Sequence, residues 1–202
     1  MGRLGVLGGT FDPPHIGHLI VAQDVVEGLA LDRLLIVPAA RPPHREACFP
    51  DLVRYELTAR AFEGADFIEV SDIEMRRSGP SYTVDTLAAV RDRYQPIELF
   101  CIIGTDQLRA IESWHEYERL PELARLVVME RGEDRDSESV PSSLPHERID
   151  VTRVDLSSTR VRERLERGES IRYLVPESIR ADVEAAWQAR TEEAVAMTGD
   201  SR

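Results

Sequence analysis

Short apolar runs alternate with helix-like segments along most of the chain. The apolar runs predict buried strands at residues 4–7, 34–37, 67–70, 98–103, 126–129 and 149–154. Apolar spacing and helix-start residues predict helices at residues 16–29, from an N-cap at Asp51, at 83–94, at 158–167 and at 176–190. Strands that are apolar on both faces are typical of a parallel sheet covered by helices on each side. With right-handed crossovers, the pattern predicts a Rossmann-like, doubly wound α/β fold.

The same pattern predicts one domain, at residues 1–190. Residues 131–147 are charged and rich in Ser and Pro, and we expect them to form a mobile surface loop. Residues 191–202 are expected to be a frayed C-terminal tail.

Composition narrows the classes of function. The chain has 202 residues, 42% of them hydrophobic, which suits one well-buried core. A net charge of −12 disfavours a general nucleic-acid role, because such a chain repels polyphosphate at long range. All 25 basic residues are Arg, so any cationic contact to phosphate comes from a guanidinium. The two cysteines do not suggest a disulfide, and no apolar run reaches membrane-spanning length, so we expect a cytoplasmic protein without membrane contact.

The strongest candidate site is the string GGTFDPPHIGH at residues 8–18, between the first strand and the first helix. In a doubly wound sheet this is where ligands bind, and the free N–H groups of the helix start favour an anion. His15 and His18 lie three apart on one helical face, and Gly17 between them leaves room for a base or ribose. Two alternatives are a plain turn whose histidines cap the helix and a zinc site, although no third ligand lies nearby in sequence.

This string resembles the T/HxGH signature of the nucleotidyltransferase superfamily, in the form carried by bacterial nicotinate-nucleotide adenylyltransferases. The resemblance extends over residues 4–173. It implies that His15 and His18 contact the phosphates of ATP. It also implies an ATP site lined by Gly8, Gly9, Thr10 and Phe11.

Two further blocks resemble the acceptor side of that family. The loop Pro42-Pro43-His44-Arg45 implies that His44 binds the mononucleotide and that the cation of Arg45 acts near the phosphates. The block SYTVDTL at residues 81–87 implies that Tyr82 and Thr83, at a helix start, meet the nicotinate carboxylate. No acidic side chain precedes Ser81 closely enough in sequence to cancel this attraction; simple N-capping is the alternative.

Residues 103–108 resemble a third block of the family, and Trp114 lies downstream of it. Gly104 allows close approach, and Asp106 is expected to accept hydrogen bonds from ribose hydroxyls of ATP; an N-cap role is the alternative. Trp114 alone suggests a core residue, whereas the family implies that it stacks on the nicotinate ring.

A fourth block, LSSTRVR at residues 156–162, opens a helix with three hydroxyls and predicts a second anion site. It implies that Ser157, Ser158 and Thr159 bind ATP and that Arg162 binds its phosphates, with capping alone as the alternative for Ser158 or Thr159. The segment at Arg131 departs from the R-P-G common in relatives, which leaves the role of Arg131 open.

The resemblance implies the reaction of ATP with nicotinate mononucleotide to give deamido-NAD and pyrophosphate, with His15, His18, Arg45 and Arg162 acting on the phosphates. Mg²⁺ is expected to be held mainly by ATP phosphates, without a metal site made of protein side chains. Alternatives are a transferase of the same superfamily that uses nicotinamide mononucleotide or phosphopantetheine, and a nucleotide-binding module without turnover. The sequence leaves the oligomeric state open, a homo-oligomer included.

Overall fold

A computed structural model describes residues 2–43, 46–130 and 143–199, the last seven of them as backbone only. Its centre is a six-stranded parallel sheet with the order β3-β2-β1-β4-β5-β6. This is the strand order of a Rossmann-like fold, as predicted. The strands are β1 (Arg3–Gly9), β2 (Arg33–Pro38), β3 (Ile68–Val70), β4 (Glu98–Gly104), β5 (Arg125–Glu130) and β6 (His146–Asp150).

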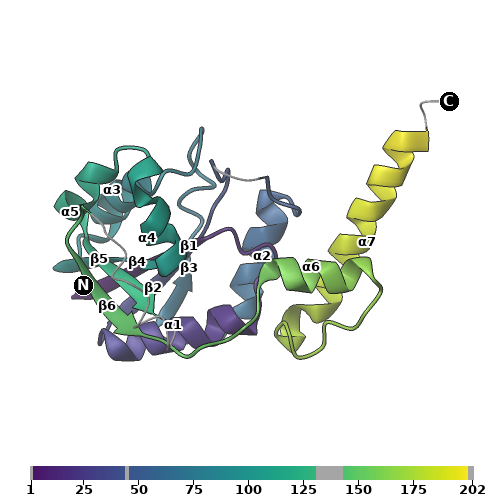
Figure 1. Cartoon of the computed structure of the whole chain (residues 1–202), viewed down its shortest axis with the longest axis horizontal. Coiled ribbons are helices and arrows are strands. Elements are labelled where there is room, and N and C mark those ends of the chain that lie inside the picture. The colour runs from purple at the N-terminus through teal and green to yellow at the C-terminus, as the bar shows by residue number, and fades with distance from the viewer. Residues whose placement is uncertain (1, 44–45, 131–142, 200–202) are drawn as a thin grey trace.

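Helices cover both faces of the sheet (Figure 1). The helices are α1 (Ile16–Gly28), α2 (Asp51–Ala61), α3 (Thr83–Tyr94), α4 (Thr105–Ala110), α5 (Leu120–Leu123), α6 (Ser158–Glu166) and α7 (Glu177–Gly199), with two short 3-10 turns at Ile111–Ser113 and Tyr117–Arg119. One face packs against α1, α2, α6 and α7, and the other against α3, α4 and α5. No helix in the described ranges is long and apolar enough to cross a membrane.

The strand sequences explain this two-sided core. Leu34 and Ile36 of β2 enter the first cluster, and Leu35 and Val37 enter the second, because successive side chains of a strand point to opposite faces. All four are at most 1% exposed. Burying one such side chain contributes about 1.5–3 kcal/mol, so the two clusters supply the main driving force for the fold.

Several boundaries differ from the sequence predictions. The last strand lies at His146–Asp150 and not at 149–154, so the end of the expected surface loop is a strand. Asp51 is the first residue of α2 and Pro50 holds the N-cap position, so Asp51 is not the N-cap. The helix α7 runs on to Gly199, beyond residue 190 where it was expected to end, and it projects from the body in Figure 1.

The edge strands correct the expectation that each strand is apolar on both faces. β3 is half-buried throughout, and β6 is largely exposed. In contrast, β1, β2, β4 and β5 are nearly continuous buried runs. The strand order reverses between β1 and β4, which are direct neighbours. Ligands bind at the carboxyl ends of the strands at such a switch point, and the predicted phosphate loop begins there.

Candidate active site

Two cavities open at the carboxyl ends of β1 and β4. The histidine cavity, of about 460 Å³, is lined by the loop after β1, the start of α1, the start of α4, and residues 151–162. The tryptophan cavity, of about 360 Å³, is lined by residues near the ends of β1 and β2, the start of α3, and residues 113–115. Gly9, Thr10 and Asp106 line both cavities. The two cavities therefore share a wall.

Gly8 and Gly9, the last two residues of β1, have different surroundings. A Cβ at Gly9 would lie 2.9 Å from Cε2 of the Phe11 ring, so only glycine fits beside this buried ring. A Cβ at Gly8 would meet no atom within 4 Å, because that side opens into the tryptophan cavity. Gly8 thus lies on the opposite side of the shared wall from Phe11, which lines the histidine cavity.

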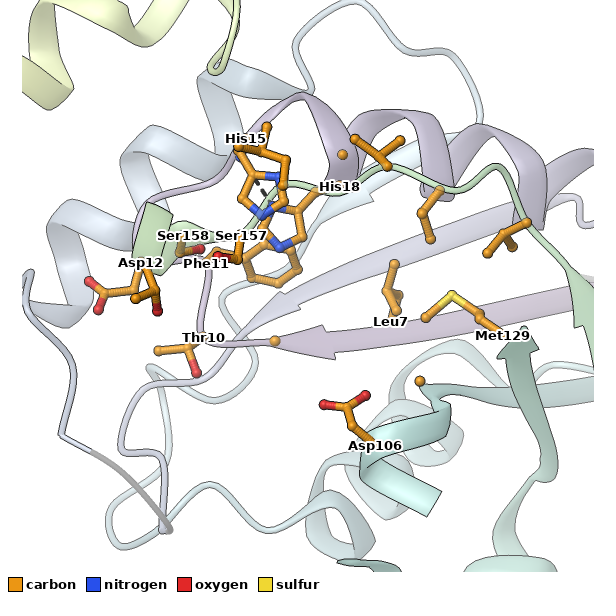
Figure 2. Close-up of a pocket in the computed structure, with 18 of the residues that line it drawn as sticks. Leu7, Thr10, Phe11, Asp12, His15, His18, Asp106, Met129, Ser157 and Ser158 are labelled. Carbon is orange, nitrogen blue, oxygen red and sulfur yellow. Dashed lines mark hydrogen bonds between the residues drawn. The ribbon is translucent and has the colours of Figure 1, made fainter. Parts of the chain in front are cut away.

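His15 and His18 stack with ring centroids 3.7 Å apart (Figure 2). The backbone N–H of His15 donates to Nδ1 of His18 at 3.1 Å. Because Nδ1 of His18 accepts this bond, the proton of the neutral ring sits on Nε2. Both rings line the cavity, as the HxGH spacing predicts. Capping is also part of the role of the histidines, because His15 holds the N-cap position of α1.

Gly17 lines the histidine cavity and also packs against His15. A Cβ there would lie 3.0 Å from Cε1 and Nδ1 of His15 and 3.4 Å from Cγ1 of Val154. The space that a side chain at this position would need is therefore partly occupied by the His15 ring. The glycine allows the two histidine rings to stack.

Arg162 reaches the loop after β1 from α6. Its Nη1 donates to the backbone carbonyl of Asp12 at 2.5 Å and lies 3.4 Å from Oδ2 of Asp12. The Asp12 carboxylate also accepts from the backbone N–H groups of Cys48 and Phe49, at 2.8 and 2.9 Å. Asp12 therefore joins three segments, and sequence reasoning gave it no role.

The hydroxyls at the start of α6 line the histidine cavity as predicted. Ser157 caps the helix by accepting from the N–H of Arg160 at 3.2 Å, and Ser158 donates to the carbonyl of Pro13 at 2.8 Å. Thr159 accepts from Nη2 of Arg162 at 3.2 Å. Of these bonds, the one from Ser158 fixes α6 against the phosphate loop. The sequence suggested helix capping as the alternative role of Ser158 or Thr159, but the residue that caps α6 is Ser157.

Asp106 lies in the first turn of α4 and not at its N-cap, which is Gly104. A Cβ at Gly104 would lie 2.6 Å from Oδ1 of Asp106, so the glycine makes room for this carboxylate. Figure 2 shows Asp106 on the opposite side of the cavity from the histidines. An exposed carboxylate in this position can accept hydrogen bonds from a ligand in either cavity.

Sequence reasoning missed the apolar end of the histidine cavity. Figure 2 shows Leu7 and Met129 away from the group formed by Asp12, Ser157 and Ser158. The cavity is therefore apolar at one end and polar at the other. Its other apolar lining residues are Val21, Val151, Val154 and Leu156. Arg109, on the same helix as Asp106, also lines this cavity and was not predicted.

Among the residues predicted to bind the mononucleotide, Tyr82, Thr83 and Trp114 line the tryptophan cavity. Trp114 also packs against the second core cluster, which agrees with the core role that its sequence context suggests. Thr83 is the first residue of α3, and Tyr82 at the N-cap makes no capping bond through its side chain. The rings of Tyr82 and His115 stack at 4.2 Å and form one side of the cavity. His115 was not predicted.

A buried carboxylate corrects the electrostatic argument for this cavity. Glu74, seven residues before Ser81, lines it although sequence reasoning saw no acidic side chain close enough to matter. Its Oε1 accepts from the Thr86 hydroxyl at 2.6 Å, and its Oε2 lies 3.4 Å from the backbone nitrogen of Ala40. The chain folds back between residues 74 and 81, which distance along the sequence does not reveal.

Some predicted residues fall outside the described ranges. His44, Arg45 and Arg131 are among them, although Pro42 and Pro43 of the same block line the tryptophan cavity. Within the described ranges, no group of three or more His, Cys, Asp or Glu side chains is arranged to hold a metal ion.

Comparisons with known proteins agree with this geometry. The cytidylyltransferase-like family matches residues 6–164. A Thermus thermophilus protein named "Probable nicotinate-nucleotide adenylyltransferase" is 45% identical over 182 residues, which cover 90% of this chain and 96% of that protein. A Gemmatimonas aurantiaca protein of the same name is 42% identical over 185 residues, which cover 88% of this chain and 87% of that protein.

Solved structures show the same fold. The nicotinic acid mononucleotide adenylyltransferase of Plasmodium falciparum, solved in complex with NaAD, superposes with a TM-score of 0.76 at 20% identity, over 95% of this chain and 98% of that chain. The same enzyme complexed with APC gives a TM-score of 0.71 at 19% identity, over 94% of this chain and 97% of that chain. At this identity the likeness concerns the fold, whereas the bacterial relatives define the family. The chain therefore belongs to the nicotinate-nucleotide adenylyltransferases of the cytidylyltransferase-like family.

Proposed function

We propose that this protein transfers the adenylyl group of ATP to the phosphate of nicotinate mononucleotide, which gives deamido-NAD and pyrophosphate. The observation that carries this proposal is the wall that the two cavities share at Gly9, Thr10 and Asp106. Two substrates that bind on either side of this wall have their reacting groups side by side, and such positioning is the main requirement of phosphoryl chemistry.

The histidine cavity suits ATP. Its apolar end, near Leu7 and Met129, fits the adenine base, and Asp106 is placed to accept from ribose hydroxyls. Its polar end fits the phosphates, because His18, Arg162 and the N-terminus of α6 supply donors there. The contacts assigned to Gly9, Thr10 and Phe11, to Gly104, and to Ser157, Ser158 and Thr159 belong to the same proposal.

The tryptophan cavity suits nicotinate mononucleotide. Trp114 offers a face for the ring, and the N–H groups at Thr83 favour its carboxylate. Glu74 weakens this attraction, although its oxygens are already engaged by Thr86 and Ala40. Tyr82 lines the cavity, and we assign Gly8 to this side also. His44 and Arg45 stay in the proposal on the strength of their family block alone.

The proposed reaction needs no protein nucleophile. A phosphate oxygen of the mononucleotide attacks the α-phosphorus of ATP, a new P–O bond forms, and pyrophosphate leaves with the electron pair of the broken bond. The attacking phosphate is already anionic, so no general base is required. The protein contributes positioning and charge stabilisation by His15, Arg45, Arg162 and Nε2–H of His18. Mg²⁺ bound with ATP would neutralise phosphate charge and would be held mainly by phosphate oxygens and water.

Pyrophosphate release by the purified chain with Mg-ATP tests this function. The acceptors are nicotinate mononucleotide, nicotinamide mononucleotide and phosphopantetheine in separate reactions, with the product masses identified. We expect the nicotinate form to react fastest and phosphopantetheine not to react. ATP binding without release with any acceptor would indicate a nucleotide-binding module, and faster reaction with either other acceptor would move the proposal to that substrate.

A further inference from the structure

Arg54 is a fully buried cation that hydrogen-bonds to residues in the walls of both cavities. It lies on α2 and is 1% exposed. Its Nε donates to the carbonyl of Phe49 at 3.0 Å, and Nη1 donates to the carbonyls of Thr10 and Ala39 at 2.8 and 2.6 Å. Its Nη2 donates to the carbonyl of Ala40 at 3.1 Å. One guanidinium therefore binds four backbone carbonyls.

These carbonyls belong to the walls of the two cavities. Thr10 lies in the shared wall, and Ala39 lines the tryptophan cavity. The N–H of Ala39 also donates to the carbonyl of Gly9 at 2.8 Å, so the loops after β1 and β2 touch directly at this point. Ala40 and Phe49 flank the segment that carries Pro42 and Pro43. Arg54 thus ties the phosphate loop to both ends of the loop on the acceptor side.

The contacts continue from Arg54 to the donor side. Cys48 and Phe49 donate to the Asp12 carboxylate, and Arg162 of α6 binds Asp12. A chain of hydrogen bonds therefore runs from α6, at the phosphate end of the histidine cavity, through Asp12 and Phe49 to Arg54.

A second branch runs to the acceptor side. The carbonyl of Ala40 accepts from Arg54, and the N–H of Ala40 lies within reach of the Glu74 carboxylate. That carboxylate also accepts from the hydroxyl of Thr86 on α3. Arg54 is therefore the point where contacts from the ATP side and the mononucleotide side meet.

The arrangement asks for arginine specifically. Burying a charge costs stability, and well-packed apolar residues of similar volume often serve a core as well as an ionic group. Only a planar guanidinium presents donors in a fixed fork that reaches four carbonyls on three segments. A protein keeps such a costly group where its fixed geometry is needed, for example where parts of a site must hold a set relative position.

We infer that Arg54 is a positioning residue that sets the relation between the two substrates, a role that rests on the proposed adenylyl transfer. It touches neither substrate. Each substrate keeps its own binding groups without Arg54, so the individual affinities depend little on it. The distance and angle between the attacking phosphate and the α-phosphorus depend on it strongly, because the shared wall is held by its hydrogen bonds.

The test separates binding from chemistry in Arg54→Met and Arg54→Lys. We expect kcat to fall by about 100-fold in the methionine variant, the scale of a misplacement near 1 Å, and less in the lysine variant. The dissociation constants of ATP and of the mononucleotide, each measured alone by calorimetry, should stay within about threefold of wild type.

Thr58→Val is the matched control. Thr58 is 0% exposed, lies one turn along α2 and donates to the carbonyl of Arg54 at 2.6 Å, and its side chain is not among those lining either cavity. It should lower the melting temperature while kcat stays near wild type. If Arg54→Met does not fold, the same measurements on Arg54→Lys, made below the melting temperature of that variant, test the inference.

The outcomes separate this inference from the proposed function. A wild-type protein that transfers no adenylyl group defeats the proposed function. An active wild type together with folded Arg54 variants of unchanged kcat defeats the positioning role and leaves the function standing. A fall in kcat matched by an equal fall in both affinities also overturns it, because that pattern indicates general loosening of the site.

Discussion

Arg162 of α6 donates to the backbone carbonyl of Asp12, which lies 150 residues earlier in the chain. The same guanidinium reaches the Asp12 carboxylate and Thr159. Arg162 therefore holds the start of α6 against the phosphate loop and lines the histidine cavity at the same time. Because Arg162 has both positions, its replacement should lower both the activity and the stability of the protein.

Replacing Arg162 by Gln should lower kcat by about 100-fold or more, because one charged transition-state donor is lost. It should also lower the melting temperature, since Asp12 keeps a buried carboxylate with one partner fewer. Arg160→Gln is the matched control, because Arg160 is exposed on the same helix and its side chain lines neither cavity. Equal activity of the two variants would remove Arg162 from the mechanism.

The hydrogen bonding of His18 predicts an order among its variants. Because Nδ1 accepts from the backbone of His15, the donor available for the proposed catalytic role is Nε2–H. Gln can present an N–H near the Nε2 position, whereas Asn can replace only Nδ1. We expect His18→Ala and His18→Asn to lose about 100-fold in kcat, and His18→Gln to lose less. Steady-state kinetics on proteins with matched circular dichroism check this order; a more active Asn variant would contradict it.

The start of α3 allows one N–H donor to be removed without disturbing the helix. Thr83 is the first helical residue, where proline fits, and Tyr82 before it has extended angles that proline tolerates. Nicotinamide mononucleotide, which carries an amide in place of the carboxylate, leaves such donors unpaired at a cost of about 1–3 kcal/mol. The wild type should therefore prefer nicotinate mononucleotide by roughly tenfold or more in kcat/KM. Thr83→Pro should reduce this ratio, and Thr83→Ala, which keeps the N–H, should not.

Trp114 should contribute to both acceptors alike, because the acid and the amide present the same ring face. Trp114→Ala is expected to raise KM for both mononucleotides by a similar factor and to leave their ratio unchanged. It should also lower the melting temperature, because Trp114 packs on the second core cluster. A change in the ratio would show that Trp114 reads the carboxylate.

The two loop glycines should separate stability from activity. Gly9→Ala places a Cβ 2.9 Å from Cε2 of the Phe11 ring and should cost about 1–3 kcal/mol of unfolding free energy. Gly8→Ala meets nothing within 4 Å and should unfold like wild type. Its methyl group enters the tryptophan cavity, so KM for the mononucleotide should rise. Denaturant unfolding and steady-state kinetics of both variants test this contrast; a destabilised Gly8→Ala would contradict it.

Cys101 on β4 is expected to resist alkylation. Burial raises the pKa of its thiol to about 12, so almost no thiolate exists at pH 8 in the folded protein. An unfolded chain has an ordinary thiol pKa and should react readily. Mass spectrometry after iodoacetamide treatment, with and without denaturant, measures this directly; labelling of Cys101 in the folded state would contradict the prediction.

Local patterns determined much of this protein. The helix predicted at residues 83–94 is the observed α3, and the alternation of buried strands and helices predicted the doubly wound parallel sheet. The cavity walls near His15, Asp106 and Ser157 were predicted because each follows a strand or opens a helix. Such signals lie within a few residues of one another, so the sequence alone carries them.

The tertiary structure decided what depends on contacts between distant segments. Glu74 lines the tryptophan cavity only because the chain folds back beside it, and the His15 ring packs beside Gly17. Arg54 stands in an ordinary helical sequence, yet it is buried and binds three other segments. A local pattern reports which face of a helix is polar, but it does not report which backbone carbonyls that face will meet.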